Sequence, residues 1–228
     1  MDGSRDRLIG ALAADLQPVR PLLPPALRTL LWLILVAIVA AVPAMFADVS
    51  ATWHRLSAVS DTWLAALGCI ATMAAAALAA FELSLPDRSR AWALLPLPAA
   101  VLWVGASGLG CMGGVLLPGT HVAATGETLD CLLFIVGLSA PLAAAMMLML
   151  RRGYSLAPPL TAAMAGLASA AAAATLLNLF HPFAVAAADL FVHGIAVLIV
   201  VVAVRAVGSR TLQNSFAVPV TVASDDSN

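Results

Sequence analysis

Cysteine and histidine supply the side chains in this chain that are best suited to metal binding or redox chemistry. Cys111 and Cys131 flank the stretch "MGGVLLPGTHVAATGETLD", which contains His121 and ends on Asp130. Thiolate and imidazole ligands together suit zinc, copper or cadmium, and two thiols in an oxidising compartment can form a disulfide. Their spacing matches no compact zinc motif, so the sequence by itself assigns no metal and no certain cofactor.

Further ionisable residues fall inside or beside apolar runs. Asp189 and His193 are four residues apart in "DLFVH", which places them on one face of a helix. Because an ionisable group exposed to lipid is costly, such residues suggest a functional site, but the two could equally satisfy each other inside a bundle. His181 lies at the same level, His121 fits a solvated loop, and Cys69, among alanines, fits a small buried apolar residue.

The composition identifies the elements that must position these groups. The 228 residues are 62% hydrophobic and 10% charged, with a mean hydropathy of +1.01, whereas soluble domains are about 25% charged. Apolar runs near the ~20 residues needed to cross a bilayer, without strand alternation, predict membrane helices. The net charge of -1 argues against direct nucleic-acid binding.

We therefore predict an all-α integral membrane bundle of six transmembrane helices, in contact with the lipid bilayer. The predicted spans are about 28–47, 62–81, 91–110, 129–150, 160–180 and 186–207. Residues 1–27 are predicted to form a cytoplasmic extension, 28–207 the membrane domain, and 208–228 a flexible cytoplasmic tail. The alanine-rich stretch 165–174 permits close helix approach, either within one bundle or between two copies in a homo-oligomer.

Arginine placement predicts the orientation, since basic residues are retained on the cytoplasmic side. There is no lysine, and ten of the eleven arginines fall on one side of the predicted spans. These are Arg5, Arg7, Arg20, Arg28, Arg88, Arg90, Arg151, Arg152, Arg205 and Arg210, with Arg55 on the other side. Both termini are therefore predicted to be cytoplasmic.

The chain opens on a predicted amphipathic helix from Asp6 to Leu16. Its apolar side chains recur at helical spacing: Leu8, Ile9, Leu12 and Leu16. Pro18 should end the helix, and "PVRPLLPP" should form an extended, stiff stalk. A helix of about twelve residues is marginal in water and needs a surface. It could lie on the inner leaflet, dock into a groove of a cytoplasmic partner, or belong to a disordered leader.

Several segments resemble the NrsF family, negative regulators of sigma F. The most specific are "PVRPLLPP", "SLPDRSRAW", the Cys131 span ending in "RRG", and "VHG" in the last span. The similarity runs from Leu8 to about Arg210, in the right order and spacing. It implies a six-span anti-sigma factor of the bacterial inner membrane, which is not an enzyme and whose cytoplasmic segment captures an extracytoplasmic-function sigma factor.

The resemblance also implies roles for particular residues. The partner-binding set would be Leu8, Ile9, Leu12, Leu16, Pro18 and Arg20. Two outward-facing cysteines of the family are associated with sensing heavy-metal or oxidative stress; Cys131 matches the first, whereas His181 stands close to the expected second. The predicted sensing set is Cys131, Cys111, His181, Asp189 and His193, of which Cys131, His181 and His193 could bind a metal ion transiently.

Other functional classes are weighed against this interpretation. A small multi-span transporter or channel would also use intramembrane Asp and His, but it would usually show broken spans or an internal repeat. Pro141 and the glycines of the fourth span permit a kink. An intramembrane enzyme ranks last, since neither a glycine-rich nucleophile motif nor "HExxH" is present.

Overall fold

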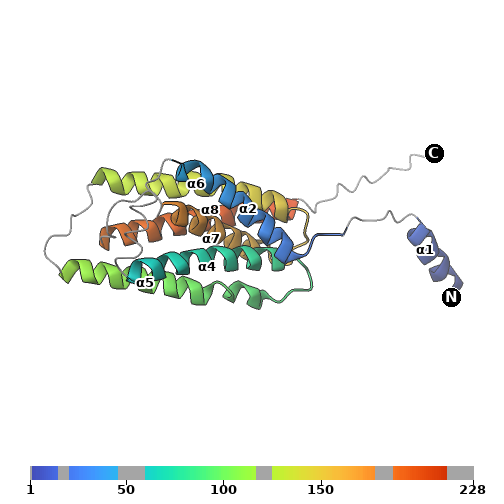
Figure 1. Cartoon of the computed structure of the whole chain (residues 1–228). Coiled ribbons are helices and arrows are strands. Elements are labelled where there is room, and N and C mark those ends of the chain that lie inside the picture. Colours follow the sequence, from blue (N-terminus) through green and yellow to red (C-terminus); the bar gives the residue numbers. More distant parts are fainter. Residues whose placement is uncertain (1, 15–20, 46–59, 117–124, 178–186, 215–228) are drawn as a thin grey trace.

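The predicted helical architecture is confirmed. The computed structural model describes the chain except residues 1, 15–20, 46–59, 117–124, 178–186 and 215–228. Within the described residues all regular structure is helical, and six helices are long and apolar enough to cross a membrane. The chain is thus a multi-pass membrane protein with a short additional helix at its N-terminus (Figure 1).

The helices follow one another along the chain with short connections. They are α1 (Asp2–Ala14), α2 (Pro25–Ala44), α4 (Ser60–Glu82), the 3-10 helix η1 (Arg90–Leu94), α5 (Leu97–Leu116), α6 (Thr125–Leu150), α7 (Pro158–Leu177) and α8 (Ala187–Asn214).

Proline places several of the helix boundaries. α2 and α7 begin at Pro25 and Pro158, ahead of the predicted starts at 28 and 160, because proline suits the first helical position, where no backbone donor is needed. The third predicted span is divided, since η1 closes on Leu95 and a new helix, α5, starts beyond Pro96. α6, by contrast, continues as one helix through Pro141.

The predicted boundary of the C-terminal tail is wrong. α8 continues to Asn214, seven residues beyond the expected end at 207, and Leu212 is buried in the main apolar core. The helix can pack closely here because a Cβ atom at Gly208 would lie only 2.9 Å from the Met147 methyl carbon. Residues 208–214 therefore belong to the bundle rather than to a flexible tail.

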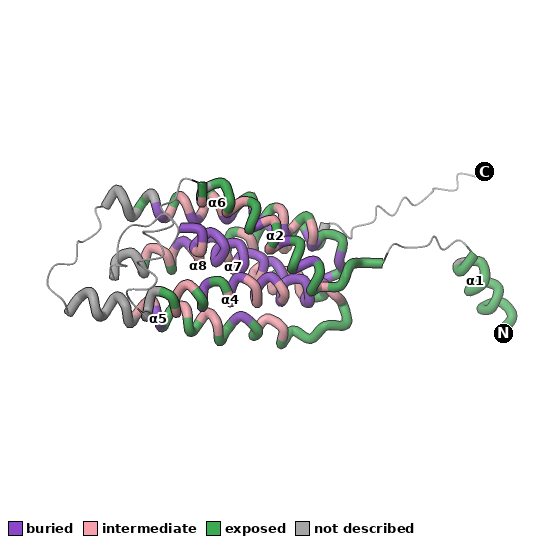
Figure 2. Tube along the Cα trace, viewed as in Figure 1, coloured by how far each residue is buried: buried purple, intermediate pink, exposed green. Residues whose placement is uncertain are grey.

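α7 forms the centre of the bundle. It packs against α8, α4 and α6, and it is the most buried of the six spans (Figure 2). Its alanine-rich stretch supplies small side chains that let neighbouring backbones approach, so that a Cβ atom at Gly166 would lie 3.0 Å from Val201 Cα on α8. The stretch thus serves packing within one bundle.

The two ends of the bundle differ in what they carry. We call "arm end" the end formed by the start of α2, residues 83–97, residues 150–158 and the end of α8 (Figure 1). The N-terminal arm, residues 1–24, leaves the bundle here, and α8 ends here too. The far end contains the starts of α4, α6 and α8.

Candidate functional site

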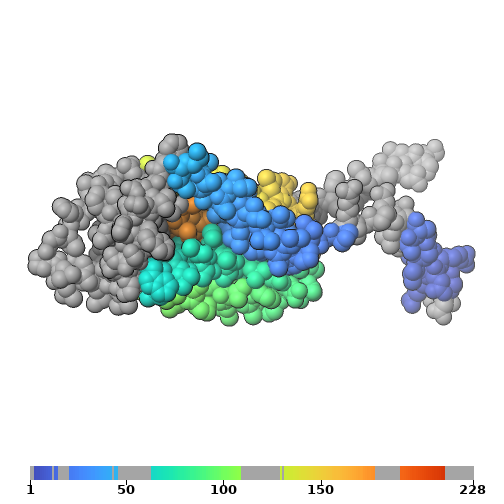
Figure 3. All heavy atoms as spheres, in the orientation of Figure 1, coloured from blue at the N-terminus to red at the C-terminus, as the bar shows by residue number. Residues whose placement is uncertain are grey.

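The N-terminal arm presents an uncovered helix. α1 begins four residues before the predicted start at Asp6, and all of its described side chains are exposed. Leu8 and Ile9 are 60% and 63% exposed, and Figure 3 shows α1 standing apart from the bundle. The side chain of Leu12, and all of Leu16, Pro18 and Arg20, lie outside the described residues.

The stalk joins the arm directly to the first span. Residues 21–24 form no helix, and Leu22 and Leu23 are exposed, in line with the predicted extended segment. The backbone then turns into α2, where the Arg28 amide donates to the Pro24 carbonyl oxygen at 3.1 Å. No folded segment separates the arm from α2, so the position of the first turn of α2 determines where the arm starts.

α2 is attached to the bundle mainly through its first half. Its buried side chains are Arg28, Thr29, Trp32 and Val36, which form one stripe at helical spacing. The Trp32 indole donates to the carbonyl oxygen of Leu142 on α6 at 3.3 Å. Beyond Val36 the described side chains of α2 are exposed or half-buried, and Figure 3 shows α2 lying across the surface of the bundle.

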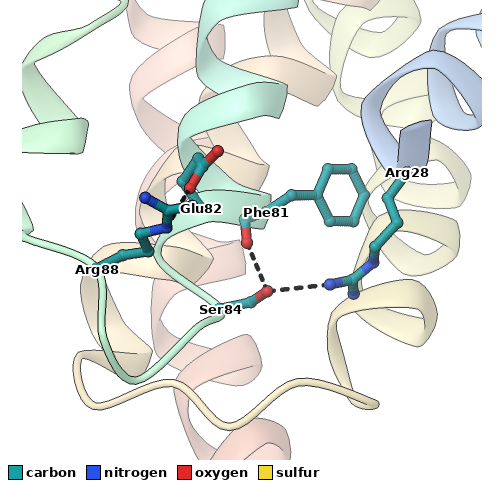
Figure 4. Close-up of polar contacts among 5 residues, drawn as sticks. All are labelled: Arg28, Phe81, Glu82, Ser84 and Arg88. Carbon is teal, nitrogen blue, oxygen red and sulfur yellow. Dashed lines mark hydrogen bonds and ion pairs between the residues drawn. The ribbon is translucent and has the colours of Figure 1, made fainter. Parts of the chain in front are cut away.

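Arg28 is a functional candidate that the sequence interpretation missed, because it was read only as an orientation signal. Its side chain is 4% exposed and donates to Ser84 Oγ at 3.1 Å and to the Met149 carbonyl oxygen. The guanidinium carbon also lies 4.6 Å from the centre of the Phe81 ring (Figure 4). The available signal was an arginine one turn inside an apolar helix that opens on two prolines.

The other orientation arginines at the arm end are exposed. Arg88 pairs with Glu82, with 2.9 Å between Nε and the carboxylate (Figure 4), while Arg90, Arg151 and Arg152 have exposed side chains. The Glu82 carboxylate is largely buried, and Arg88 compensates its charge locally.

Hydroxyl groups complete the arm end by covering the end of α4. The Leu83 carbonyl oxygen accepts from Ser155 Oγ at 2.8 Å and from Thr161 Oγ1 at 3.2 Å. Carbonyls at a helix C-terminus lack intrahelical donors, and these two side chains supply them. The α6–α7 connection is thereby joined to the α4–η1 connection.

The predicted sensing residues belong to the far end, and the structure describes only some of them. Cys131 is buried in an apolar cluster with Ile135, Ala173, Leu177 and Ala196, contributed by α6, α7 and α8. His193 is half-buried on α8. The side chains of Cys111, His121, Asp130, His181 and Asp189 lie outside the described residues, so their predicted grouping stays a prediction. Where side chains are described, no three of the His, Cys, Asp and Glu residues gather closely enough to hold a metal ion.

Comparison with known families identifies the chain. A family model described as "Negative regulator of sigma F" matches residues 12–213. This chain belongs to the NrsF family. NrsF proteins are regulatory anti-sigma factors rather than enzymes, and this confirms the predicted class of function. No curated protein and no solved structure gave a significant match.

The limits of the NrsF match agree with the structure at both ends. It starts at Leu12, so it includes the stalk and all six spans but leaves out Leu8 and Ile9 of α1. It ends at Gln213, one residue before the end of α8 and beyond the predicted start of the tail at 208. The extended α8 is therefore part of the NrsF architecture in this chain.

Proposed function

We propose that this NrsF protein holds an extracytoplasmic-function sigma factor at the bacterial inner membrane by binding it with the N-terminal arm. The observation that supports the proposal is the exposure of every described side chain of α1, apolar Leu8 and Ile9 included. A helix that offers apolar side chains to a groove is a common mode of peptide recognition. The anchors proposed for that groove are Leu8, Ile9, Leu12 and Leu16, followed by Pro18 and Arg20 of the stalk.

The expected binding energy is sufficient for capture. Each Leu or Ile side chain transferred from water into a groove contributes about 1.5–3 kcal/mol. Four anchors then contribute about 6–12 kcal/mol before the cost of ordering the arm is subtracted. Micromolar affinity requires about 8 kcal/mol, which this range reaches without a folded cytoplasmic domain.

The proposal requires the arm to be cytoplasmic, where sigma factors act. Arg88, Arg90, Arg151 and Arg152 belong to the connections at the arm end. An excess of arginine in short loops is typical of the cytoplasmic side of membrane proteins. We assign both termini to the cytoplasm and the far end to the opposite face of the membrane.

Release of the sigma factor is assigned to the far end, in response to heavy-metal, oxidative or other envelope stress. The proposed sensing residues are Cys131, Cys111, His181, Asp189 and His193, with Cys131, His181 and His193 as metal ligands. Cys131 supports this role because its apolar cluster joins α6, α7 and α8, so modification of the thiol would disturb the packing of all three helices. A shift in their packing would reach the arm end through α6, over about 27 Å from Cys131 to Met149 at 1.5 Å per residue.

Binding of the full-length protein in nanodiscs to the purified sigma factor encoded nearest to the gene tests the proposal. The test variant is Ile9→Asp, and the matched control is Leu156→Asp, because both side chains are 63% exposed but Leu156 lies in the α6–α7 connection. We expect Ile9→Asp to weaken binding by about tenfold or more, since a charged group cannot enter an apolar groove. Leu156→Asp should bind like the wild type.

The alternative outcomes are informative. If the wild type does not bind this sigma factor, capture by the arm is wrong and α1 is better explained as an interfacial helix. If the wild type binds and Ile9→Asp binds equally well, another surface of the bundle makes the contact.

A further inference from the structure

The charge of Arg28 is compensated in an unusual way. Among the described residues its guanidinium contacts a hydroxyl, a backbone carbonyl and an aromatic ring, and none of these is a carboxylate. The nearby carboxylate of Glu82 is engaged with Arg88 instead (Figure 4). A buried guanidinium of this kind must draw its compensation from dipoles rather than from a counter-ion.

Two helix C-termini provide those dipoles. Met149 is the penultimate residue of α6, and its carbonyl belongs to the last turn, where intrahelical donors are missing. α4 ends at Glu82, and Ser84, which accepts from Arg28, itself donates to the Phe81 carbonyl at 2.6 Å. The C-terminal end of a helix carries partial negative charge and favours a cation, so Arg28 lies between two favourable ends.

This arrangement makes the start of α2 dependent on two other helices. Arg28 is in the first turn of α2, four residues beyond Pro24 of the stalk. Because one guanidinium contacts the ends of both α4 and α6, any relative movement of those ends must move Arg28 or break one of its hydrogen bonds. α2 has few buried side chains beyond Val36 to hold it otherwise.

We propose that Arg28 is the positioning residue of the N-terminal arm: by binding the C-terminal ends of α4 and α6, it holds the arm where the sigma factor is captured. The proposal rests on the proposed function. It makes the arm responsive to the packing of α4 and α6, which form part of the main core with Trp32. Arg28 itself need not touch the sigma factor.

The test measures position and capture on the same full-length protein in nanodiscs. Spin labels are introduced as noncanonical amino acids at Leu31 of α2 and Leu156, both exposed, and their distance distribution is recorded. Sigma-factor binding is measured in parallel. The test variant is Arg28→Gln, and the matched control is Arg152→Gln, which removes the same charge just after α6 from an exposed side chain.

We expect Arg28→Gln to broaden or displace the distance distribution and to weaken sigma-factor binding about tenfold, whereas Arg152→Gln changes neither. Arg28→Lys keeps the charge but lacks the planar two-donor group, so it should restore binding only partly. Ser84→Ala, which removes one acceptor of Arg28, should shift the distance in the same direction by a smaller amount. Circular dichroism at the temperature of measurement verifies that each variant is folded.

The possible failures are separable. If the wild type binds no sigma factor, the proposed function fails, and the role of Arg28 in capture fails with it. If the wild type binds but Arg28→Gln leaves both measurements unchanged, only the positioning role is wrong. A changed distance with unchanged binding also overturns it, because Arg28 would then stabilise α2 without positioning the arm.

Discussion

Gly153 lies so close to Ser84 that a Cβ atom added at Gly153 would come within 2.7 Å of the Ser84 carbonyl oxygen. The contact joins the connection after α6 to the connection after α4, beside the Arg28 contacts of Ser84. A real Cβ atom cannot occupy that distance, so one of the two backbones would have to move. Glycine at position 153 is therefore required by close packing at the arm end.

Gly153→Ala should destabilise the protein, because the new methyl group meets backbone rather than a movable side chain. Overpacking of this kind typically lowers the free energy of unfolding by about 1–3 kcal/mol. Thermal unfolding in detergent, followed by circular dichroism, measures the change. Gly137→Ala is the control, since a Cβ atom there meets nothing within 4 Å, and unchanged or raised stability is expected. Equal stability of Gly153→Ala and the wild type would show that the two connections are not in contact.

Removal of both hydroxyls that cover the end of α4 should also weaken the arm end. In the double variant Ser155→Ala and Thr161→Val, the Leu83 carbonyl oxygen loses both side-chain donors. An unsatisfied buried acceptor costs about 1–3 kcal/mol, whereas Ser155→Ala alone should cost less because Thr161 remains. Denaturant titration of the two variants measures the difference. Ser209→Ala, which loses only a bond to the Ala206 carbonyl in its own helix, should have little effect.

The assigned orientation predicts opposite results for two reporter fusions. Green fluorescent protein fused after Gln213, at the arm end of α8, should fluoresce in cells, and alkaline phosphatase at the same point should be inactive. Alkaline phosphatase fused after Leu116, at the far end of α5, should be active. The reason is the excess of arginine on the side of the termini. Active phosphatase after Gln213 would reverse the orientation and exclude capture of a cytoplasmic protein by the arm.

Cys69 and Cys131 should resist alkylation in the folded protein. Both thiols are buried, with Cys69 fully covered and Cys131 5% exposed. A maleimide reagent should modify each of them about tenfold or more slowly in the folded state than after unfolding, because reaction needs access to the sulfur. Peptide mapping by mass spectrometry separates these two from Cys111. Rapid modification of Cys131 without any stimulus would mean that the far end opens spontaneously and that burial does not restrain the proposed sensor.

Much of the fold followed from the sequence, because a bilayer leaves few solutions. A segment that crosses it must be about 20 apolar residues long and must satisfy its own backbone groups, so composition alone predicted six helices. Boundaries were less accurate. α8 runs past Arg205, Gly208 and Arg210, which were expected to mark its end, since Leu212 finds an apolar partner only in the assembled core.

The candidate site was predictable only in its local part. The apolar spacing around Leu8 and Ile9 indicated an exposed helix, and the structure describes one. Nothing local distinguished Arg28 from the nine other arginines assigned to the same side, because its partners lie 56 and 121 residues further along the chain. Likewise, Cys131 appeared as an outward-facing thiol in sequence, yet α7 and α8 cover it.

The sequence by itself determined that this protein is a helical membrane protein, where its spans lie and which end gathers the arginines, since these properties depend on runs of neighbouring residues and on the thickness of the bilayer. Only the tertiary structure decided which arginine becomes buried, which helix forms the centre and how the N-terminal arm is attached. These depend on carbonyls, aromatic rings and small side chains that meet across helices, and no local pattern encodes which distant groups will meet. The difference is clearest at Arg28, whose place in the sequence indicates only a membrane boundary, while its hydrogen bonds join the start of α2 to the ends of two other helices.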